Sequence, residues 1–302
     1  MGERVGRQQS VGSPHSIDGL WNDHRRRSRY VRDLIRAPAD VTSDRTARSQ
    51  IPKVVVQYWH DAAHIPTDVE ACMSSWDMLK PGGISRRVFD DQTARAFIAD
   101  ELTQDHVSAF ERCHHPAMRC DYFRLCYILR LGGLYVDADD VMLGDVSWVF
   151  DGGFLRVRPL CYDLSAQTMV DVEAALWDDG RLDDRIFYFN NNPIAAPAGH
   201  PVVADALQRA TEMLLQGGRA IADIQSTTGP GNLTACLVRH DINLREGGCD
   251  RDFDILVGWD DVAMSVWPLS YRDDRRNWRR WQPDDDDLAG DRRPDRFAGP
   301  TE

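Results

Sequence analysis

The sequence predicts an α/β domain, because short apolar strands alternate with amphipathic helices along most of the chain. The 302 residues are 42% hydrophobic, which is enough to bury a sizeable core. The alternation begins at Ile51, where IPKVVVQYWH, a proline-led run of β-branched and aromatic residues, is typical of a buried strand. Strands that alternate with helices in this way usually form a sheet covered by helices.

The individual strands and helices are predicted from the periodicity of apolar residues and from the glycines and prolines that end them. Strands are predicted over 51–60, 85–91, 134–137 and 185–201, with a further late strand in the stretch MSVWPLSYRDD. Helices are predicted over 68–80, 92–102, 106–113, 117–131 and 202–218, and another is predicted after the break at Gly229-Pro230. Pro81 and Gly82 end the first of these helices, and Gly132-Gly133 closes the helix over 117–131.

The two ends of the chain differ from this body. Residues 1–50 hold ten Arg and six Asp or Glu in a chain of net charge −12, and residues 21–35 predict an amphipathic helix. We expect a flexible or loosely docked arm; the alternative is a helix that contacts a partner or an anionic membrane surface. Residues 283–302 have too few apolar side chains to pack and are expected to be disordered. The folded domain is therefore expected over 51–282.

The amino-acid composition argues against several classes of function. An acidic body argues against nucleic acid as the main partner, because phosphate contacts need clustered cations. No run of 18 apolar residues and no signal-peptide pattern occurs, so a cytoplasmic protein is expected. The seven cysteines are scattered without a CxxC pair, which favours free thiols.

Three aspartates directly follow the predicted strand LYVD. In open α/β sheets, ligands usually bind at the carboxyl ends of strands, where Asp137, Asp139 and Asp140 are expected to lie. Two carboxylates at positions i and i+2 can reach one hard cation, and oxygen ligands favour Mg²⁺ or Mn²⁺ over zinc. A solvated turn or a helix cap is the alternative interpretation.

The preceding helix adds two charged side chains. Asp121 and Arg124 are three residues apart, so they share one helix face that leads directly to the aspartates. Together, the helix and the strand exit can aim a carboxylate and a guanidinium at the ligand that a metal holds.

This block resembles the DxD sugar transferases, the group that includes the yeast-type initiating α-1,6-mannosyltransferases and bacterial capsular sugar transferases. The glucosylating domains of large clostridial toxins are related to it. The family carries a D-x-x-R helix, then Gly-Gly, then an aromatic residue two positions before D-x-D. Here the residues in this order are Asp121, Arg124, Gly132, Gly133, Tyr135, Asp137 and Asp139.

Other segments, within 51–272, support the resemblance. The strand IPKVVVQYWH is similar to the family's opening strand, which implies nucleotide contacts for Gln57 and stacking on the base for Trp59. NNNPIAAPAGHP and TTGPGNLT are similar to its Asn-containing strand and its Thr-Gly-Pro element, with Asn191 as a sugar-side contact. The family's C-terminal His or Ser-Trp pair is harder to place. The candidates are Ser265 with Trp267, His240 and Asn277.

The resemblance implies a GT-A fold, with a mixed, mostly parallel sheet and a Rossmann-like nucleotide-binding half. It implies transfer of a hexose from a UDP- or GDP-sugar to a glycan, small-molecule or protein acceptor, with retention of configuration, as in polysaccharide biosynthesis. Asp137 and Asp139 would hold Mn²⁺ or Mg²⁺, while Asp121 and Arg124 would contact sugar hydroxyls and Tyr135 would pack near the sugar.

Two other functions fit parts of the sequence. LYVDADDVM also fits the D-x-D-x-[TV] motif of haloacid-dehalogenase-type phosphatases, in which the first Asp is a nucleophile. Those enzymes need a later lysine, and both lysines here, Lys53 and Lys80, precede Asp137. The second alternative is a sugar-nucleotide-binding protein that has lost activity, which the unplaced C-terminal ligand would explain.

Overall fold

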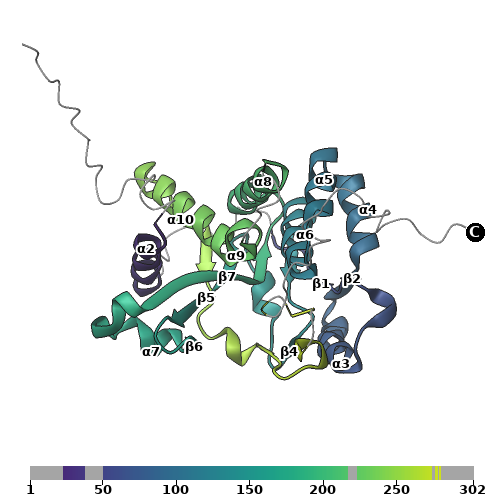
Figure 1. Ribbon diagram of the computed structural model, residues 1–302, viewed down its shortest axis with the longest axis horizontal. Helices are drawn as coiled ribbons and strands as arrows, with labels where there is room; N and C mark the ends of the chain where they lie inside the picture. Colours follow the sequence, from purple (N-terminus) through teal and green to yellow (C-terminus); the bar gives the residue numbers. More distant parts are fainter. Residues whose placement is uncertain (1–22, 38–49, 217–222, 274–275, 278, 280–302) are drawn as a thin grey trace, which may run out of the picture.

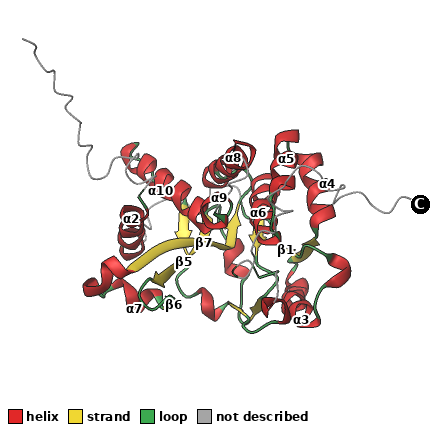
Figure 2. Ribbon diagram, viewed as in Figure 1, coloured by secondary structure: helices red, strands yellow, loops and turns green. Residues whose placement is uncertain are grey.

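The computed structural model describes residues 23–37, 50–216, 223–273, 276, 277 and 279, which form helices and strands around a central sheet (Figures 1 and 2). The α-helices in these residues are α2 (His24–Arg36), α3 (Thr67–Ser75), α4 (Asp91–Glu101), α5 (Gln104–Arg112), α6 (Pro116–Leu131), α7 (Val172–Leu176), α8 (Pro201–Gln216), α9 (Ile224–Thr227) and α10 (Pro230–Glu246). The strands are β1 (Val54–Tyr58), β2 (Ser85–Phe89), β3 (Gly133–Tyr135), β4 (Asp140–Met142), β5 (Leu155–Asp163), β6 (Thr168–Val170), β7 (Arg185–Ala196), β8 (Phe253–Ile255) and β9 (Ala263–Ser265). Short 3-10 helices lie at η1 (Ala62–His64), η2 (Trp76–Gly82), η3 (Ser147–Phe150), η4 (Asp179–Asp184), η5 (Trp259–Asp261) and η6 (Ser270–Asp273).

Among the described residues, seven strands form the central sheet in the order β2-β1-β3-β7-β5-β6, with β8 also paired to β5. The pairs β1–β2, β1–β3 and β5–β8 are parallel, whereas β7 is antiparallel to both β3 and β5, and β6 is antiparallel to β5. Five strands therefore point one way, and β6 and β7 point the other way. Strands β4 and β9 form a separate antiparallel pair. The predicted α/β class with a mixed, mostly parallel sheet is confirmed.

The sheet separates two apolar layers. Alternation along β1 directs Val54, Val56 and Tyr58 to the main core and Val55 to a second cluster on the other face. Helices α4, α5, α6, α8 and α10 cover the main core, above the sheet in Figure 1, and α3 and β4 lie on the opposite side. No helix in the described ranges is long and apolar enough to span a membrane.

The amphipathic helix predicted over 21–35 is present as α2, and it packs on the domain instead of being loosely docked. Val31 is fully buried and Leu34 is 2% exposed, both in the main core. The Ser28 hydroxyl accepts a hydrogen bond from the Phe187 backbone N–H at 2.8 Å, and the Tyr30 hydroxyl donates to Asp241 at 2.7 Å. An apolar stripe on this Arg-rich helix explains the docking. Residues 1–22, 38–49 and the predicted tail at 283–302 lie outside the described residues.

The connection from α6 to β3 requires glycine at two positions. Gly132 has φ +68°, and a Cβ there would come within 2.8 Å of the Ala196 carbonyl oxygen. Gly133 has φ +119°, and its Cβ would meet Val54 Cγ1 at 2.6 Å. Both conformations favour glycine. The predicted helix end at this pair is confirmed, and the strand that follows starts at Gly133.

Other predicted elements differ in detail. The helix over 68–80 changes after Ser75 to the 3-10 helix η2, and its left-handed cap is Gly83 (φ +78°) rather than Pro81 or Gly82. The predicted strand over 185–201 is present as β7 with the three asparagines at 190–192 inside it, but it ends at Ala196. The sequence patterns did not predict β4, β5, β6, β8 or α7.

Candidate functional site

Helix α6 places Asp121 and Arg124 on the side that faces the end of β3. The helix begins at Pro116, and the His115 ring accepts a hydrogen bond from the Ala117 N–H at 3.0 Å, which caps the helix. The side chains of Asp121 and Arg124 form the expected i, i+3 ion pair at 3.0 Å. Both side chains are buried, so neither charge is solvated like a surface pair.

Arg124 joins three segments of the chain around one point. Its Nη2 donates to Asp137 Oδ1 at 2.8 Å, and its Nη1 donates to the Asn191 carbonyl oxygen at 2.5 Å. Its Cζ lies 4.4 Å from the centroid of the Tyr135 ring, a cation–π distance. The Asn191 side chain in turn donates to Asp121 Oδ1 at 2.9 Å. The planar, permanently charged guanidinium thus fixes both carboxylates relative to β7.

Two of the three aspartates face a cavity and the third is held away from it. The Asn192 side chain accepts from the Asp137 N–H at 2.9 Å and donates to Asp140 Oδ2 at 2.8 Å. Ser265, on β9, donates to the other oxygen of Asp140 at 2.5 Å. Asp137 and Asp139 line the cavity, whereas Asp140 has both oxygens bound within the protein.

Asp139 is contacted by residues from much later in the chain. Tyr271 donates its hydroxyl to Asp139 Oδ2 at 2.6 Å, and the Arg272 guanidinium forms an ion pair with the same oxygen. Arg272 stacks on Trp267, with its Cζ 3.7 Å from the ring centroid.

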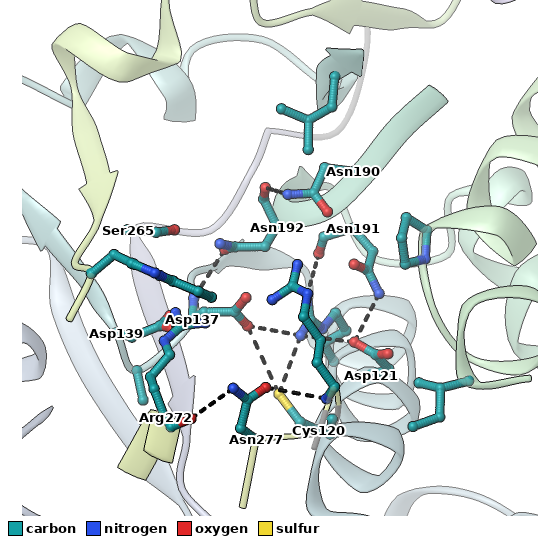
Figure 3. Close-up of a pocket in the computed structure, with 18 of the residues that line it drawn as sticks. Cys120, Asp121, Asp137, Asp139, Asn190, Asn191, Asn192, Ser265, Arg272 and Asn277 are labelled. Carbon is teal, nitrogen blue, oxygen red and sulfur yellow. Dashed lines mark hydrogen bonds and ion pairs between the residues drawn. The ribbon is translucent and has the colours of Figure 1, made fainter. Parts of the chain in front are cut away.

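These side chains line one cavity of about 670 Å³ (Figure 3). Figure 3 shows Asp121, Asn191 and Cys120 on one side and Asp139, Arg272 and Ser265 on the other, with Asp137 between them. The volume falls in the range of small-molecule sites. Acidic, amide and aromatic groups converge on it from both halves of the chain. Its lining includes Trp59, Cys120, Asp121, Arg124, Asp137, Asp139, Asn190, Asn191, Asn192, Ser265, Trp267, Tyr271, Arg272 and Asn277.

Burial dominates the electrostatics of the carboxylates. It raises the pKa of Asp137 to about 6 although Arg124 opposes the shift, and it raises the pKa of Asp140 to about 7, aided by Asp139. Burial also raises the pKa of Asp121 above its usual range. The pKa of Cys120 is raised to about 12, again by burial, so this thiol in the cavity is a poor nucleophile at neutral pH.

The donor set fits a hard divalent cation. Asp137 and Asp139 both present carboxylate oxygens to one cavity, and oxygen donors favour Mg²⁺ or Mn²⁺. Within the described residues, no group of three or more His, Cys, Asp or Glu side chains is arranged around one point. A metal held by these two carboxylates would take its remaining ligands from substrate and water, as Mg²⁺ commonly does.

Most residues expected at the site from the sequence do line the cavity. These are Trp59, Asp121, Arg124, Asp137, Asp139, Asn191, Ser265 and Trp267. Gln57 and Tyr135 do not line it. Gln57 is fully buried within β1, and Tyr135 is fully buried with its hydroxyl 2.9 Å from the Cys120 sulfur, beneath Arg124.

The residues considered for the family's C-terminal His or Ser-Trp position differ in where they lie. Ser265, Trp267 and Asn277 lie at the cavity, whereas His240 does not line it and pairs with Asp252 at 2.8 Å. Sequence reasoning missed Tyr271 and Arg272, which contact Asp139 directly. Their only signal is their place in the stretch MSVWPLSYRDD. The sequence predicts a late strand there, but β9 ends at Ser265 and Ser270–Asp273 forms a 3-10 helix.

Comparison with known proteins finds similarity over the same segment. Residues 66–152 match the family described as "Glycosyltransferase sugar-binding region containing DXD motif". A curated relative, the initiation-specific alpha-1,6-mannosyltransferase of Schizosaccharomyces pombe, is 26% identical over 212 residues, which are 63% of this chain and 48% of the relative. The chain thus spans about half the length of this relative. These two matches confirm the resemblance to the DxD sugar transferases.

A solved structure is also similar. The PaToxG glycosyltransferase aligns with 78% of this chain and 80% of its own, with a TM-score of 0.46 and 13% sequence identity.

Proposed function

We propose that this protein is a metal-dependent glycosyltransferase that moves a sugar from a nucleoside-diphosphate sugar to an acceptor hydroxyl. The single observation that carries the proposal is the cavity in which the D-x-x-R helix and the DxD carboxylates meet. Arg124 ties Asp121 and Asp137 together by ion pairs of 3.0 and 2.8 Å, so the two motifs form one unit in space.

The donor would lie across the end of β1 and β3. Trp59 is 7% exposed and borders the cavity, where it can pack against the nucleotide base. Asp121 and Asn191 are hydrogen-bonded to each other and offer polar groups to the sugar hydroxyls. Arg124 keeps both groups in place, and its charge offsets the negative charge of the surrounding carboxylates.

Asp137 and Asp139 would hold the divalent cation, Mn²⁺ or Mg²⁺. When bound, the cation would neutralise the negative charge that develops on the departing nucleoside diphosphate. The protein's own part is to fix the two carboxylates: Asn192 holds the Asp137 backbone, and Val266 N–H donates to the Asp139 carbonyl at 2.8 Å.

We infer hexose transfer with retention of configuration from the family resemblance. Departure of the nucleoside diphosphate leaves oxocarbenium character at the anomeric carbon, as in glycoside hydrolysis. For retention, the acceptor hydroxyl must approach the face from which the leaving group departs. The curated relative's name supports a hexose donor, and a glycan, a small molecule or a protein is the proposed acceptor.

The two alternatives predict different site chemistry. A phosphatase of the haloacid-dehalogenase type needs a lysine beside the nucleophile, but neither Lys53 nor Lys80 lines the cavity in the described structure. In addition, Asp137 is already ion-paired with buried Arg124. The degenerate binding protein would retain the cavity without turnover, so it is separated from the enzyme by an activity measurement.

The test combines binding and turnover. We expect UDP- or GDP-sugars of one base class to raise the melting temperature only when Mn²⁺ or Mg²⁺ is present, because a ligand that binds the native state stabilises it. Asp139→Asn should retain the fold but lose metal-dependent hydrolysis or transfer. Retained turnover in Asp139→Asn would overturn the site assignment. Binding without turnover in the wild type would favour the degenerate binding protein.

A further inference from the structure

The carboxylate of Asp139 is already ion-paired with a positively charged side chain, that of Arg272. Arg272 and the Tyr271 hydroxyl both bind Asp139 Oδ2, from a segment that follows β9. Side-chain exposure is 12% for Asp139 and 14% for Arg272, so this ion pair is largely removed from water. A second cation that approaches Asp139 would meet the guanidinium at short range.

The segment that carries Arg272 is firmly attached. Ser270 donates its backbone N–H to Asp68 of α3 at 2.6 Å, and its hydroxyl donates to the same carboxylate at 3.0 Å. Leu269 is 5% exposed in an apolar cluster that also contains Trp59. The backbone is therefore fixed, and only the long Arg272 side chain needs to move for Asp139 to be freed.

We propose that Arg272 is a built-in cation of this site, which competes with a divalent metal for Asp139 and must be displaced when the metal binds. This inference rests on the proposed function and specifies how its metal site is controlled. A guanidinium stays protonated at any physiological pH, so its repulsion of the metal can be relieved only by movement. Two cations on one partly buried carboxylate repel strongly because solvent screens them poorly.

Arg272 differs from the other arginine of the site in a way that makes it the exchangeable one. Arg124 is held by Asp121, Asp137, the Cys120 sulfur and the Asn191 carbonyl, so its displacement would break four polar interactions. Among the described residues, the Arg272 guanidinium has the Asp139 carboxylate as its polar partner. Its other contacts are with two aromatic rings, Trp267 at 3.7 Å and Tyr271 at 5.2 Å from Cζ to the centroid.

The test measures binding of Mn²⁺ alone, from the electron paramagnetic resonance signal of the free ion. We expect Arg272→Gln to bind Mn²⁺ about tenfold or more tightly than the wild type, because the competing charge is gone. The matched control is Arg158→Gln, which removes a charge from the same cavity at a residue paired with Asp260 instead. Equal or weaker binding by Arg272→Gln, or equal tightening by the control, would overturn the inference.

Two further variants separate this inference from the proposed function. Trp267→Leu removes the ring that supports Arg272 but keeps its charge, and it should also tighten Mn²⁺ binding. If Arg272→Gln fails to fold, this variant decides, and an unchanged affinity rejects the competition. If Asp139→Asn binds Mn²⁺ as well as the wild type does, the metal site of the proposed function is itself wrong. If Asp139→Asn loses binding and Arg272→Gln matches the wild type, only the competition is wrong.

Discussion

Arg124 shows how one buried residue can organise a site. Its guanidinium is 3% exposed, bridges two carboxylates and reaches the backbone of β7. We predict that Arg124→Gln lowers the free energy of unfolding by about 2 to 4 kcal/mol, because it leaves the buried Asp121 and the partly buried Asp137 without their counter-ion. Urea denaturation followed by circular dichroism would measure the loss.

A surface arginine provides the control for this prediction. Arg26 pairs with Asp23 at 3.4 Å, with both side chains about half exposed. Arg26→Gln should change the stability by less than about 0.5 kcal/mol, since exposed pairs contribute little. A loss in Arg124→Gln no larger than this would mean that Asp121 and Asp137 become neutral by protonation once the arginine is gone.

The turn between α6 and β3 sets the spacing between the D-x-x-R helix and the DxD aspartates. We predict that Gly132→Ala and Gly133→Ala each destabilise the protein by about 1 to 3 kcal/mol from backbone conformation alone. The close approaches to Ala196 and Val54 add to that cost. Thermal unfolding of both variants would test this.

Gly82→Ala is the matched control for the glycine pair. A Cβ at Gly82 would have no atom within 4 Å, and its φ is not positive. This substitution should be neutral, or stabilising by up to about 1 kcal/mol, because alanine restricts the unfolded chain. If all three variants behaved alike, the conformation of the turn would not be what requires glycine.

Local sequence patterns predicted the helices and strands that have regularly spaced apolar residues or a glycine or proline at their end. The helix over 117–131 and the strand after it follow from apolar spacing and the glycine pair, and both are confirmed. By contrast, β5 alternates buried and half-buried residues between irregular segments, and it contains Pro159 at a register shift against β7. Strands β6 and β8 have three residues each, too few for a period to be seen.

The whole molecule includes α2, so the folded unit does not begin at Ile51. We predict that Leu34→Ala lowers the stability by about 2 to 5 kcal/mol, because a 2% exposed leucine of the main core leaves a cavity. Chemical denaturation would measure it. Asp33→Ala, one position earlier on the exposed face of α2, should change the stability by less than about 0.5 kcal/mol. A small effect of Leu34→Ala would instead mean that α2 is only loosely docked.

The candidate site was predictable only where its residues are close in sequence. Asp121 and Arg124 lie on one helix, and Asp137 and Asp139 directly follow the short strand after it, so spacing alone places them together. Tyr271 and Arg272 reach Asp139 across more than 130 residues, through the pairing of β4 with β9. No local pattern records which distant segment will cross a strand end, and a short, irregular segment gives no periodic signal.

This long separation also bears on how the protein is made. Arg272 is translated 133 residues after Asp139, which is about 7 to 27 s later at typical rates of synthesis. During that interval the nascent chain can complete the D-x-x-R helix and the DxD strand while the Asp139 carboxylate still lacks its arginine. Divalent ions in the cell can therefore reach Asp139 on the ribosome before the last strand pair closes over it.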